Sequence, residues 1–94
     1  MFDIEARDEH VFALSGRLDA SQVPKAEALV DSVQQSTVMD LTELDYISSA
    51  GLGFFLKTSL RLGRVGHTLR LVNPTPYVEN VFHYAGLDSL FVQE

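Results

Sequence analysis

The stretch VMDLTELDYISSAGLGFF, Val38–Phe55, decides how the whole chain is interpreted. Its first residues, with the threonine before them, form a short apolar and β-branched run, which predicts an inner strand that leads to Asp40. Residues 41–46 predict a polar turn. Apolar side chains then recur every three or four residues, which is the spacing of one helix face, at Leu52, Phe55, Leu56 and Leu62. The stretch therefore predicts a strand, a turn and a helix in succession.

Two serines, Ser48 and Ser49, stand at the predicted helix start. Free backbone N–H groups and the positive end of the helix dipole point toward a hydroxyl at such a place. One interpretation is that the serine only caps the helix. The other is a phosphorylation site, because a helix N-terminus suits a dianion. The small residues Ala50 and Gly51 would let the active site of another protein approach the hydroxyl.

Several motifs along the chain resemble, in order, those of the STAS domain family, the sulfate transporter and anti-sigma factor antagonist domains. They are GRLD at 16–19, DLT at 40–42, YISSAGLG at 46–53, LVNPTP at 71–76 and AGL at 85–87. The resemblance covers nearly the whole chain and implies one STAS domain over residues 1–94. It also implies the α/β fold of that family.

The resemblance assigns a role to Ser49. Bacterial regulators of the family commonly carry Asp-Ser-Ser/Thr-Gly-Leu, and the serine after the Asp is their phosphoacceptor. Aligned on residues 51–53, that serine is Ser49. Ser48 stands where the Asp is usual, and Ala50 replaces the second hydroxyl residue.

Two further residues are candidates for binding a partner. Asp19 either caps the helix predicted after it or, as the resemblance implies, lies in a loop beside the phosphoacceptor that belongs to the partner surface. Phe54 falls off the helix face that carries Leu52 and Phe55, which predicts a partly exposed aromatic ring; the alternative is a helix buried on two sides. The predicted partner-binding residues are Asp19, Ser48, Ala50, Gly51, Leu52 and Phe54.

The first third of the chain predicts a hairpin and a helix. Apolar and polar residues alternate over residues 2–7, and residues 11–15 form a second, more apolar strand. The helix that follows is expected to be capped by Asp19 or Ser21, with Pro24 in its first turn.

The last third predicts a strand, a helix and a final strand. The first strand covers residues 68–72, and the helix has Thr75 as its cap, Pro76 at its first position and Gly86 after its end. Residues 89–92 are a possible short edge strand. The element order predicts an α/β fold with a mixed sheet of about four to five strands, covered mainly by three helices and joined by right-handed crossovers.

Composition restricts the classes of function. With 94 residues, 46% hydrophobic and 21% charged, the chain is expected to be one soluble globular domain. The net charge of −6 disfavours nucleic acid as a direct partner. No apolar run approaches the roughly 20 residues that span a bilayer, and no signal peptide is evident, so no membrane association and a cytoplasmic location are expected. The absence of cysteine excludes thiolate catalysis and disulfides.

No catalytic motif is present. The three histidines, His10, His67 and His83, lack metal-ligand spacing, so no metal is expected, and no cofactor site is evident. There is no G-x-S-x-G elbow and no phosphate-binding loop. We therefore interpret the chain as a kinase substrate and binding partner, and not as an enzyme.

The resemblance implies a bacterial anti-sigma factor antagonist that regulates transcription by partner switching. The unphosphorylated protein would bind an anti-sigma factor, typically a serine kinase, and so free its sigma factor. Phosphorylation of Ser49 would add a charge of about −1.5 to −2 at the contact and end the binding, and a phosphatase of the PP2C type would reset it. The alternative, favoured by Ser48 in place of Asp, is a non-phosphorylated STAS scaffold or subunit in a larger regulatory or lipid-transport assembly.

Overall fold

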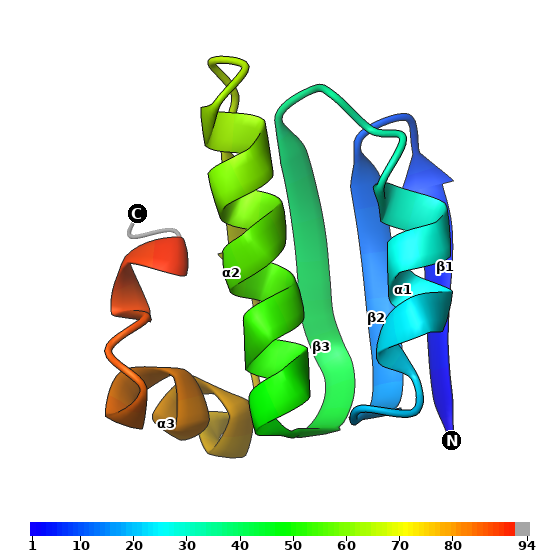
Figure 1. Ribbon diagram of the computed structural model, residues 1–94. Coiled ribbons are helices and arrows are strands. Elements are labelled where there is room, and N and C mark those ends of the chain that lie inside the picture. The colour runs from blue at the N-terminus through cyan, green and yellow to red at the C-terminus, as the bar shows by residue number, and fades with distance from the viewer. Residues whose placement is uncertain (92–94) are drawn as a thin grey trace.

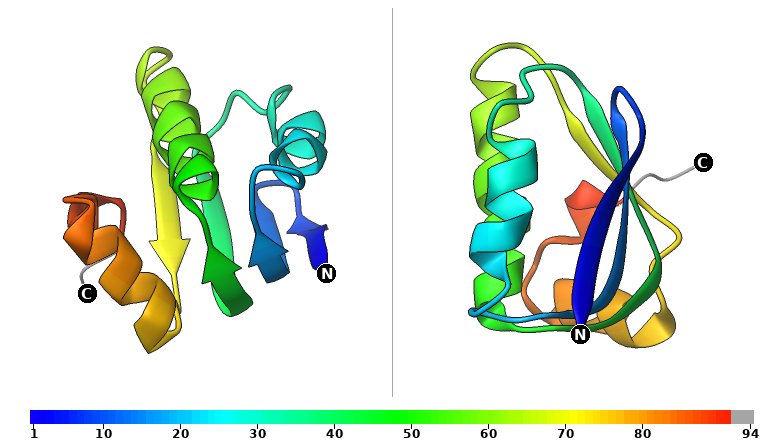
Figure 2. Two further views of the ribbon diagram at one scale, coloured as in Figure 1. Left: turned by 60° about the horizontal axis from the view of Figure 1, so that its bottom comes forward. Right: turned by 90° about the vertical axis from the view of Figure 1, so that its right-hand side faces the viewer.

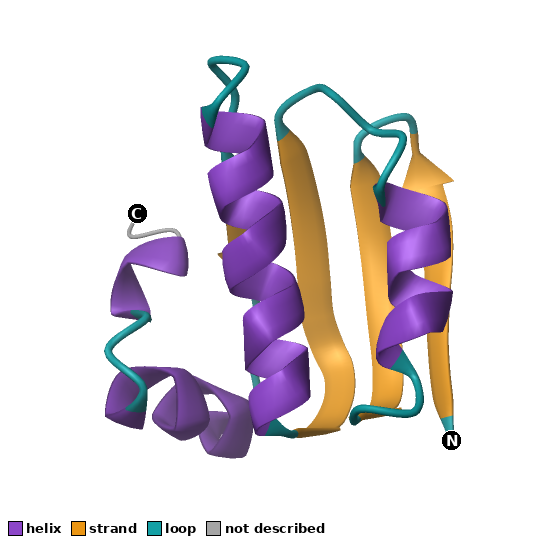
Figure 3. Cartoon of the chain, viewed as in Figure 1, coloured by secondary structure: helices purple, strands orange, loops and turns teal. Residues whose placement is uncertain are grey.

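The computed structural model describes residues 1–91, and its central feature is a four-stranded mixed sheet (Figure 1). Its strands, which lie in the spatial order of their numbers, are β1 (Phe2–Asp8), β2 (Val11–Leu18), β3 (Thr37–Ile47) and β4 (Leu69–Val72). The helices are α1 (Val23–Val30), α2 (Ser49–Gly63), α3 (Pro76–Tyr84) and the 3-10 helix η1 (Asp88–Leu90). β1 and β2 form an antiparallel hairpin, and the pairs β2–β3 and β3–β4 are parallel. The predicted α/β fold is confirmed (Figure 3).

The helices are distributed unevenly around the sheet. α1 and α2 lie side by side on one face, and α3 lies on the side of the sheet where β4 is the outer strand (Figure 2). Alternate side chains of the strands face the helices and are buried, among them Phe2, Ile4, Phe12, Leu14, Met39, Leu41, Leu69 and Leu71. The other side chains of β1, such as Asp3 and Glu5, are exposed. One face of the sheet is therefore the core, and the other is polar.

The side chain of Lys25 in α1 contacts the outer strand β1. Its Nζ lies 3.2 Å from the backbone oxygen of Phe2 and 3.3 Å from Oδ1 of Asp3. These contacts connect the first helix to the edge of the sheet.

β3 includes residues 41–46, so the predicted turn is wrong there. The register of β3 against β2 shifts twice, between Ala13 and Ser15 and again between Gly16 and Arg17, and each shift places an extra residue in β3. The buried positions of the strand are consequently Thr37, Met39, Leu41, Leu44 and Ile47. Because two of these intervals are three residues long, the strand lacks the regular alternation that would reveal it in the sequence.

β2 continues three residues beyond its predicted end at Ser15. Gly16 allows this, because its φ is +84° and a Cβ there would lie 1.6 Å from the backbone oxygen of Met1. The next residue, Arg17, donates its N–H to that oxygen over 3.0 Å. The extension carries β2 alongside the whole second half of β3.

The start of α1 differs from the prediction. Its N-cap is Gln22, which makes no side-chain capping bond, so Asp19 and Ser21 do not cap the helix. The backbone N–H groups of Gln22 and Val23 both donate to the backbone oxygen of Asp19, at 3.0 and 3.2 Å. With this turn in place, the helix begins one residue later than a Ser21 cap and three residues later than an Asp19 cap would start it.

The start and end of α3 are as predicted. The Thr75 hydroxyl accepts the N–H of Val78 over 3.3 Å, and Pro76 occupies the first helical position. After the helix, Gly86 has a φ of +75°, and Leu87 donates its N–H to the oxygen of Phe82 over 2.9 Å. Both ends are specified by local chemistry, which explains why the sequence reveals them.

The predicted edge strand at 89–92 is wrong where the structure describes it. Residues 88–90 form η1, and Phe91 makes an isolated bridge to Leu71; Val92 lies outside the described residues. Within residues 1–91, no helix combines the length and apolar character needed to cross a membrane.

Candidate functional site

The two serines at the start of α2 have different environments. Ser48 is the N-cap, and its Oγ accepts the N–H of Gly51 over 3.3 Å. Ser49 is the first residue of the helix and is exposed, and its hydroxyl makes no hydrogen bond within residues 1–91. The cap interpretation therefore applies to Ser48, and it is wrong for Ser49.

The end of β2 lies directly against this helix start. Ser48 donates its N–H to the backbone oxygen of Leu18 over 3.0 Å. A Cβ at Gly51 would lie 2.9 Å from the same oxygen and 2.7 Å from Cγ1 of Ile47. Gly51 is therefore buried and required for close packing, and its role in the approach of a partner stays a prediction.

Asp19 follows Leu18 and so lies in the loop next to the helix start. Its Oδ1 accepts the hydroxyl of Ser21 over 2.6 Å and the N–H of Ser21 over 3.1 Å. The hydroxyl bond is the main reason that the pKa of Asp19 lies below its ordinary value of 3.8, although desolvation opposes the shift. A half-buried carboxylate, ionised at neutral pH, is thus held in a tight turn beside the serines.

Ala50 and Leu52 are the other predicted contact residues of the first turn. Both are partly exposed, and Leu52 also packs against the core. The open part of the helix start therefore consists of Ser49 with Ala50, Leu52 and the edge of Ser48.

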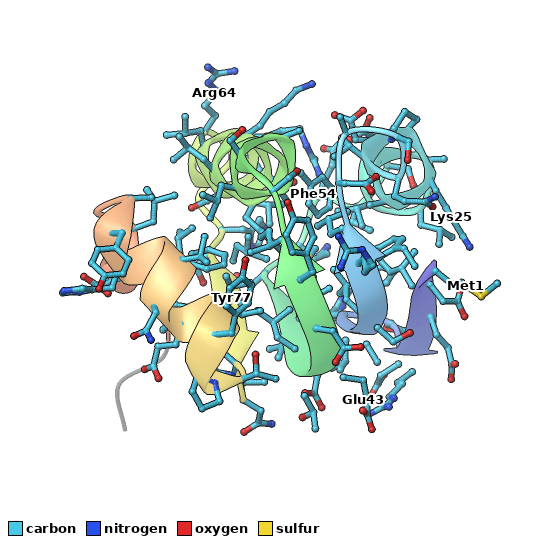
Figure 4. All side chains as sticks on the ribbon, turned by 90° about the horizontal axis from the view of Figure 1, so that it is seen from below. Met1, Lys25, Glu43, Phe54, Arg64 and Tyr77 are labelled. Carbon is cyan, nitrogen blue, oxygen red and sulfur yellow. The ribbon has the colours of Figure 1, made fainter. Side chains whose placement is uncertain are left out.

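Phe54 is not on this surface, and the prediction that it is partly exposed is wrong. Its side chain is 2% exposed, and its ring packs edge to face on that of Phe55, with 5.2 Å between the centroids. The helix is covered on two sides, because the sheet lies below it and α1 lies beside it (Figure 4). Its buried residues are Gly51, Phe54, Phe55, Thr58 and Leu62. Leu56, assigned by its spacing to the buried face, is instead 40% exposed.

A ladder of three stacked side chains was not predicted. The guanidinium carbon of Arg17 lies 4.1 Å from the ring centroid of Tyr46, and this ring stacks on Tyr77 with centroids 6.2 Å apart and planes 19° apart. Arg17 and Tyr46 are paired across β2 and β3, close to where these strands meet the start of α2. Tyr77 comes from α3 and is 50% exposed. No local pattern connects residues so far apart in sequence.

Among the described residues, neither a histidine nor a metal site accompanies Ser49. Among residues 1–91, the rings of the three histidines contact Glu9, Ser36, Tyr84 and Asp88, and none contacts Ser48 or Ser49. Within the described part of the chain, no three His, Cys, Asp or Glu side chains gather where they could hold a metal ion. The site is an accessible hydroxyl at a helix start, with an acidic loop beside it.

Comparison with known proteins identifies the family. The STAS domain model matches residues 1–94, and the chain belongs to the STAS domain family. It is 35% identical to the anti-sigma factor antagonist BtrV of Bordetella bronchiseptica over 85 residues, which cover 86% of this chain and 73% of that protein.

Solved structures show the same fold. The anti-sigma factor antagonist SpoIIAA in its unphosphorylated form matches with a TM-score of 0.80 and 24% identity, over 100% of this chain and 88% of that one. The phosphorylated form of the Bacillus protein matches with a TM-score of 0.74 and 22% identity, over 100% and 91% of the two chains. BtrV and SpoIIAA are both named as anti-sigma factor antagonists, and the chain is not an enzyme.

Proposed function

We propose that the protein is an anti-sigma factor antagonist whose binding is switched off by phosphorylation of Ser49. The observation that carries the proposal is the division of roles between the serines: Ser48 caps α2, which leaves the exposed hydroxyl of Ser49 uncommitted. The names of BtrV and SpoIIAA, and the existence of SpoIIAA in two phosphorylation states, support it.

The helix start is suited to hold a phosphate. The N–H groups of Ser49 and Ala50 find no acceptor within residues 1–91, and the first turn of α2 contains no acidic residue. A phosphate on Ser49 would gain these donors and the positive end of the helix dipole. Ser48 in place of the usual Asp is compatible with this role, since serine and aspartate are both favoured N-caps.

The partner in this proposal is an anti-sigma factor that is also a serine kinase. Its contact surface would include Ser49 and the Asp19 loop, with Ser48, Ala50 and Leu52 around them. Phosphorylation adds a charge of about −1.5 to −2 there, and burying that charge in an interface is unfavourable. A loss of about 1–3 kcal/mol of binding free energy is enough to change occupancy many-fold. A phosphatase of the PP2C type would restore binding, and the exchange would take place in the cytoplasm.

The test is intact-mass spectrometry after incubation with ATP and the serine kinase encoded nearest to this gene. We expect a gain of one phosphate that disappears in Ser49→Ala and remains in the matched variant Ser59→Ala, on the same helix. Binding of the kinase should be retained by Ser49→Ala and weakened by Ser49→Asp. Equal binding by both variants, with no phosphate gained, would instead indicate the scaffold function.

A further inference from the structure

A shallow apolar groove runs along the outer side of α2, away from the sheet. It has a volume of about 270 Å³ and is lined by Gly53, Leu56, Lys57, Leu60, Arg61 and Arg64. Leu56 and Leu60 are 40% and 56% exposed. Figure 4 shows Arg64, at the end of this α2 groove, projecting outward from the helix layer. The two leucines are four residues apart, so they lie next to each other on one exposed helix face.

Gly53 is a glycine that the fold itself does not require. A Cβ at this position would have no atom within 4 Å, in contrast to Gly51 two residues earlier. Glycine inside a helix costs about 0.5–1 kcal/mol relative to alanine. Gly53 lies four residues after Ser49 and three before Leu56, so it continues the same helix face between them. A bare backbone there permits close approach by a second chain.

The rim of the α2 groove is positively charged, although the whole chain has a net charge of −6. Arg61 donates to the backbone oxygens of Val33 and Val30, at 2.7 and 2.9 Å, and these neutral acceptors leave its charge uncompensated. Arg64 has no ion pair within residues 1–91, and α2 contains no acidic residue. Of the three basic residues of the groove, only Lys57 has a carboxylate partner in the described part of the chain, Glu27 at 3.3 Å. The complementary surface would carry apolar and acidic side chains.

We propose that the α2 groove docks an acidic, apolar segment of the anti-sigma factor. This inference rests on the proposed function, because the groove continues the helix face that begins at Ser49. Leu56 lies seven residues beyond Ser49, which is about 10 Å along the helix axis at about 1.5 Å per residue. A single partner surface can therefore cover both. The groove contributes binding free energy that does not come from the Ser49 hydroxyl. A phosphate on Ser49, at one end of the contact, weakens the binding of the whole surface.

The test measures the dissociation constant of the unphosphorylated protein for the purified serine kinase encoded nearest to this gene, by titration calorimetry. The double variant Leu56→Ala/Leu60→Ala should bind at least about tenfold more weakly. Arg64→Glu should also weaken binding, more strongly at low salt than at high salt. The matched control is Leu29→Ala, which removes a leucine of similar exposure, 43%, from α1 outside the groove.

Gly53→Ala separates docking from folding, because it should stabilise the helix and yet weaken binding. Groove variants that bind as tightly as the wild type would overturn the docking site and leave the proposed function standing. Failure of the wild type itself to bind the kinase would overturn the proposed function, and the docking site with it. Circular dichroism of each variant establishes that the fold is intact.

Discussion

The adjacent serines Ser48 and Ser49 differ in the hydrogen bonding of their hydroxyl groups. Ser48 accepts a backbone N–H and completes the helix start, whereas the hydroxyl of Ser49 has no partner among residues 1–91. Stability and the proposed regulation can therefore be altered separately at neighbouring positions.

Replacing Ser48 with alanine should lower the free energy of unfolding by about 1 kcal/mol, because an N-cap acceptor is lost. Ser49→Ala should change it by less than about 0.5 kcal/mol, as expected for an exposed side chain outside any network. Urea denaturation of the three proteins gives both values. A larger loss for Ser49→Ala than for Ser48→Ala would contradict the division of roles.

Two aspartates should make stability depend on acid pH. The hydroxyl of Thr42 donates to Oδ1 of Asp40 over 2.6 Å, and this bond is the main cause of the lowered pKa of Asp40. The hydroxyl of Ser21 lowers the pKa of Asp19 in the same way. Because the folded-state pKa of each aspartate lies below its ordinary value of 3.8, the stabilisation is complete above that pH. It is lost as the pH falls through the folded-state pKa.

The measurement is the urea midpoint between about pH 6 and about pH 2. Wild type should lose stability more steeply with falling pH than Asp40→Asn or Asp19→Asn. Asp31→Asn is the control, since its carboxylate accepts no hydrogen bond within the described chain. Parallel pH profiles for wild type and all three variants would refute the expected role of Asp19 and Asp40.

At the scale of the element, α2 shows how two glycines in one helix can have opposite effects. Gly51 faces the end of β2 and leaves no space for a side chain, whereas Gly53 faces open space. Both belong to the same short motif, so the sequence alone does not distinguish them.

Gly51→Ala should destabilise the protein by about 1–3 kcal/mol, because the new methyl group would force the helix away from the backbone of Leu18. Gly53→Ala should stabilise it by about 0.5–1 kcal/mol through helix propensity. The pair is measured by thermal or urea unfolding, and each variant is the control for the other. Equal effects of the two substitutions would mean that α2 does not pack closely on β2.

The elements that the sequence predicted well are those specified locally. Thr75 and Pro76 mark the start of α3 by chemistry within one helical turn. The buried face of α2 was predicted incorrectly, because apolar residues lie at 52 and from 54 to 56 and so surround much of the helix. Which of these side chains are covered depends on the position of α1 beside the helix. β3 was divided incorrectly because its two bulges are defined by pairing with β2, which leaves no local signal.

At the scale of the whole molecule, aromatic rings connect the sheet side of α2 to the C-terminal segment. Phe55 lies 5.5 Å from Phe82 of α3, which lies 4.8 Å from Phe91, as measured between ring centroids. Near the candidate site, Tyr77 of α3 likewise stacks on Tyr46 of β3. Such contacts form only when the complete fold assembles, so sequence patterns do not reveal them.

Phe82→Ala should lower the free energy of unfolding by about 3–5 kcal/mol, because a fully buried ring is replaced by a cavity. Tyr84→Ala is the matched control on the same helix, since Tyr84 is 87% exposed and should contribute little. Differential scanning calorimetry compares the two. A loss below about 1 kcal/mol for Phe82→Ala would show that α3 is not part of the cooperative core.

The contact between Lys25 and the backbone oxygen of Phe2 bears on how the protein behaves at high concentration. An outer strand with free backbone groups is a template on which other chains can aggregate. The ammonium group of Lys25 occupies a carbonyl on that edge, and an incoming strand would have to displace it and its partner Asp3. We therefore expect the lysine that joins α1 to the hairpin to oppose the growth of the sheet into fibrils as well.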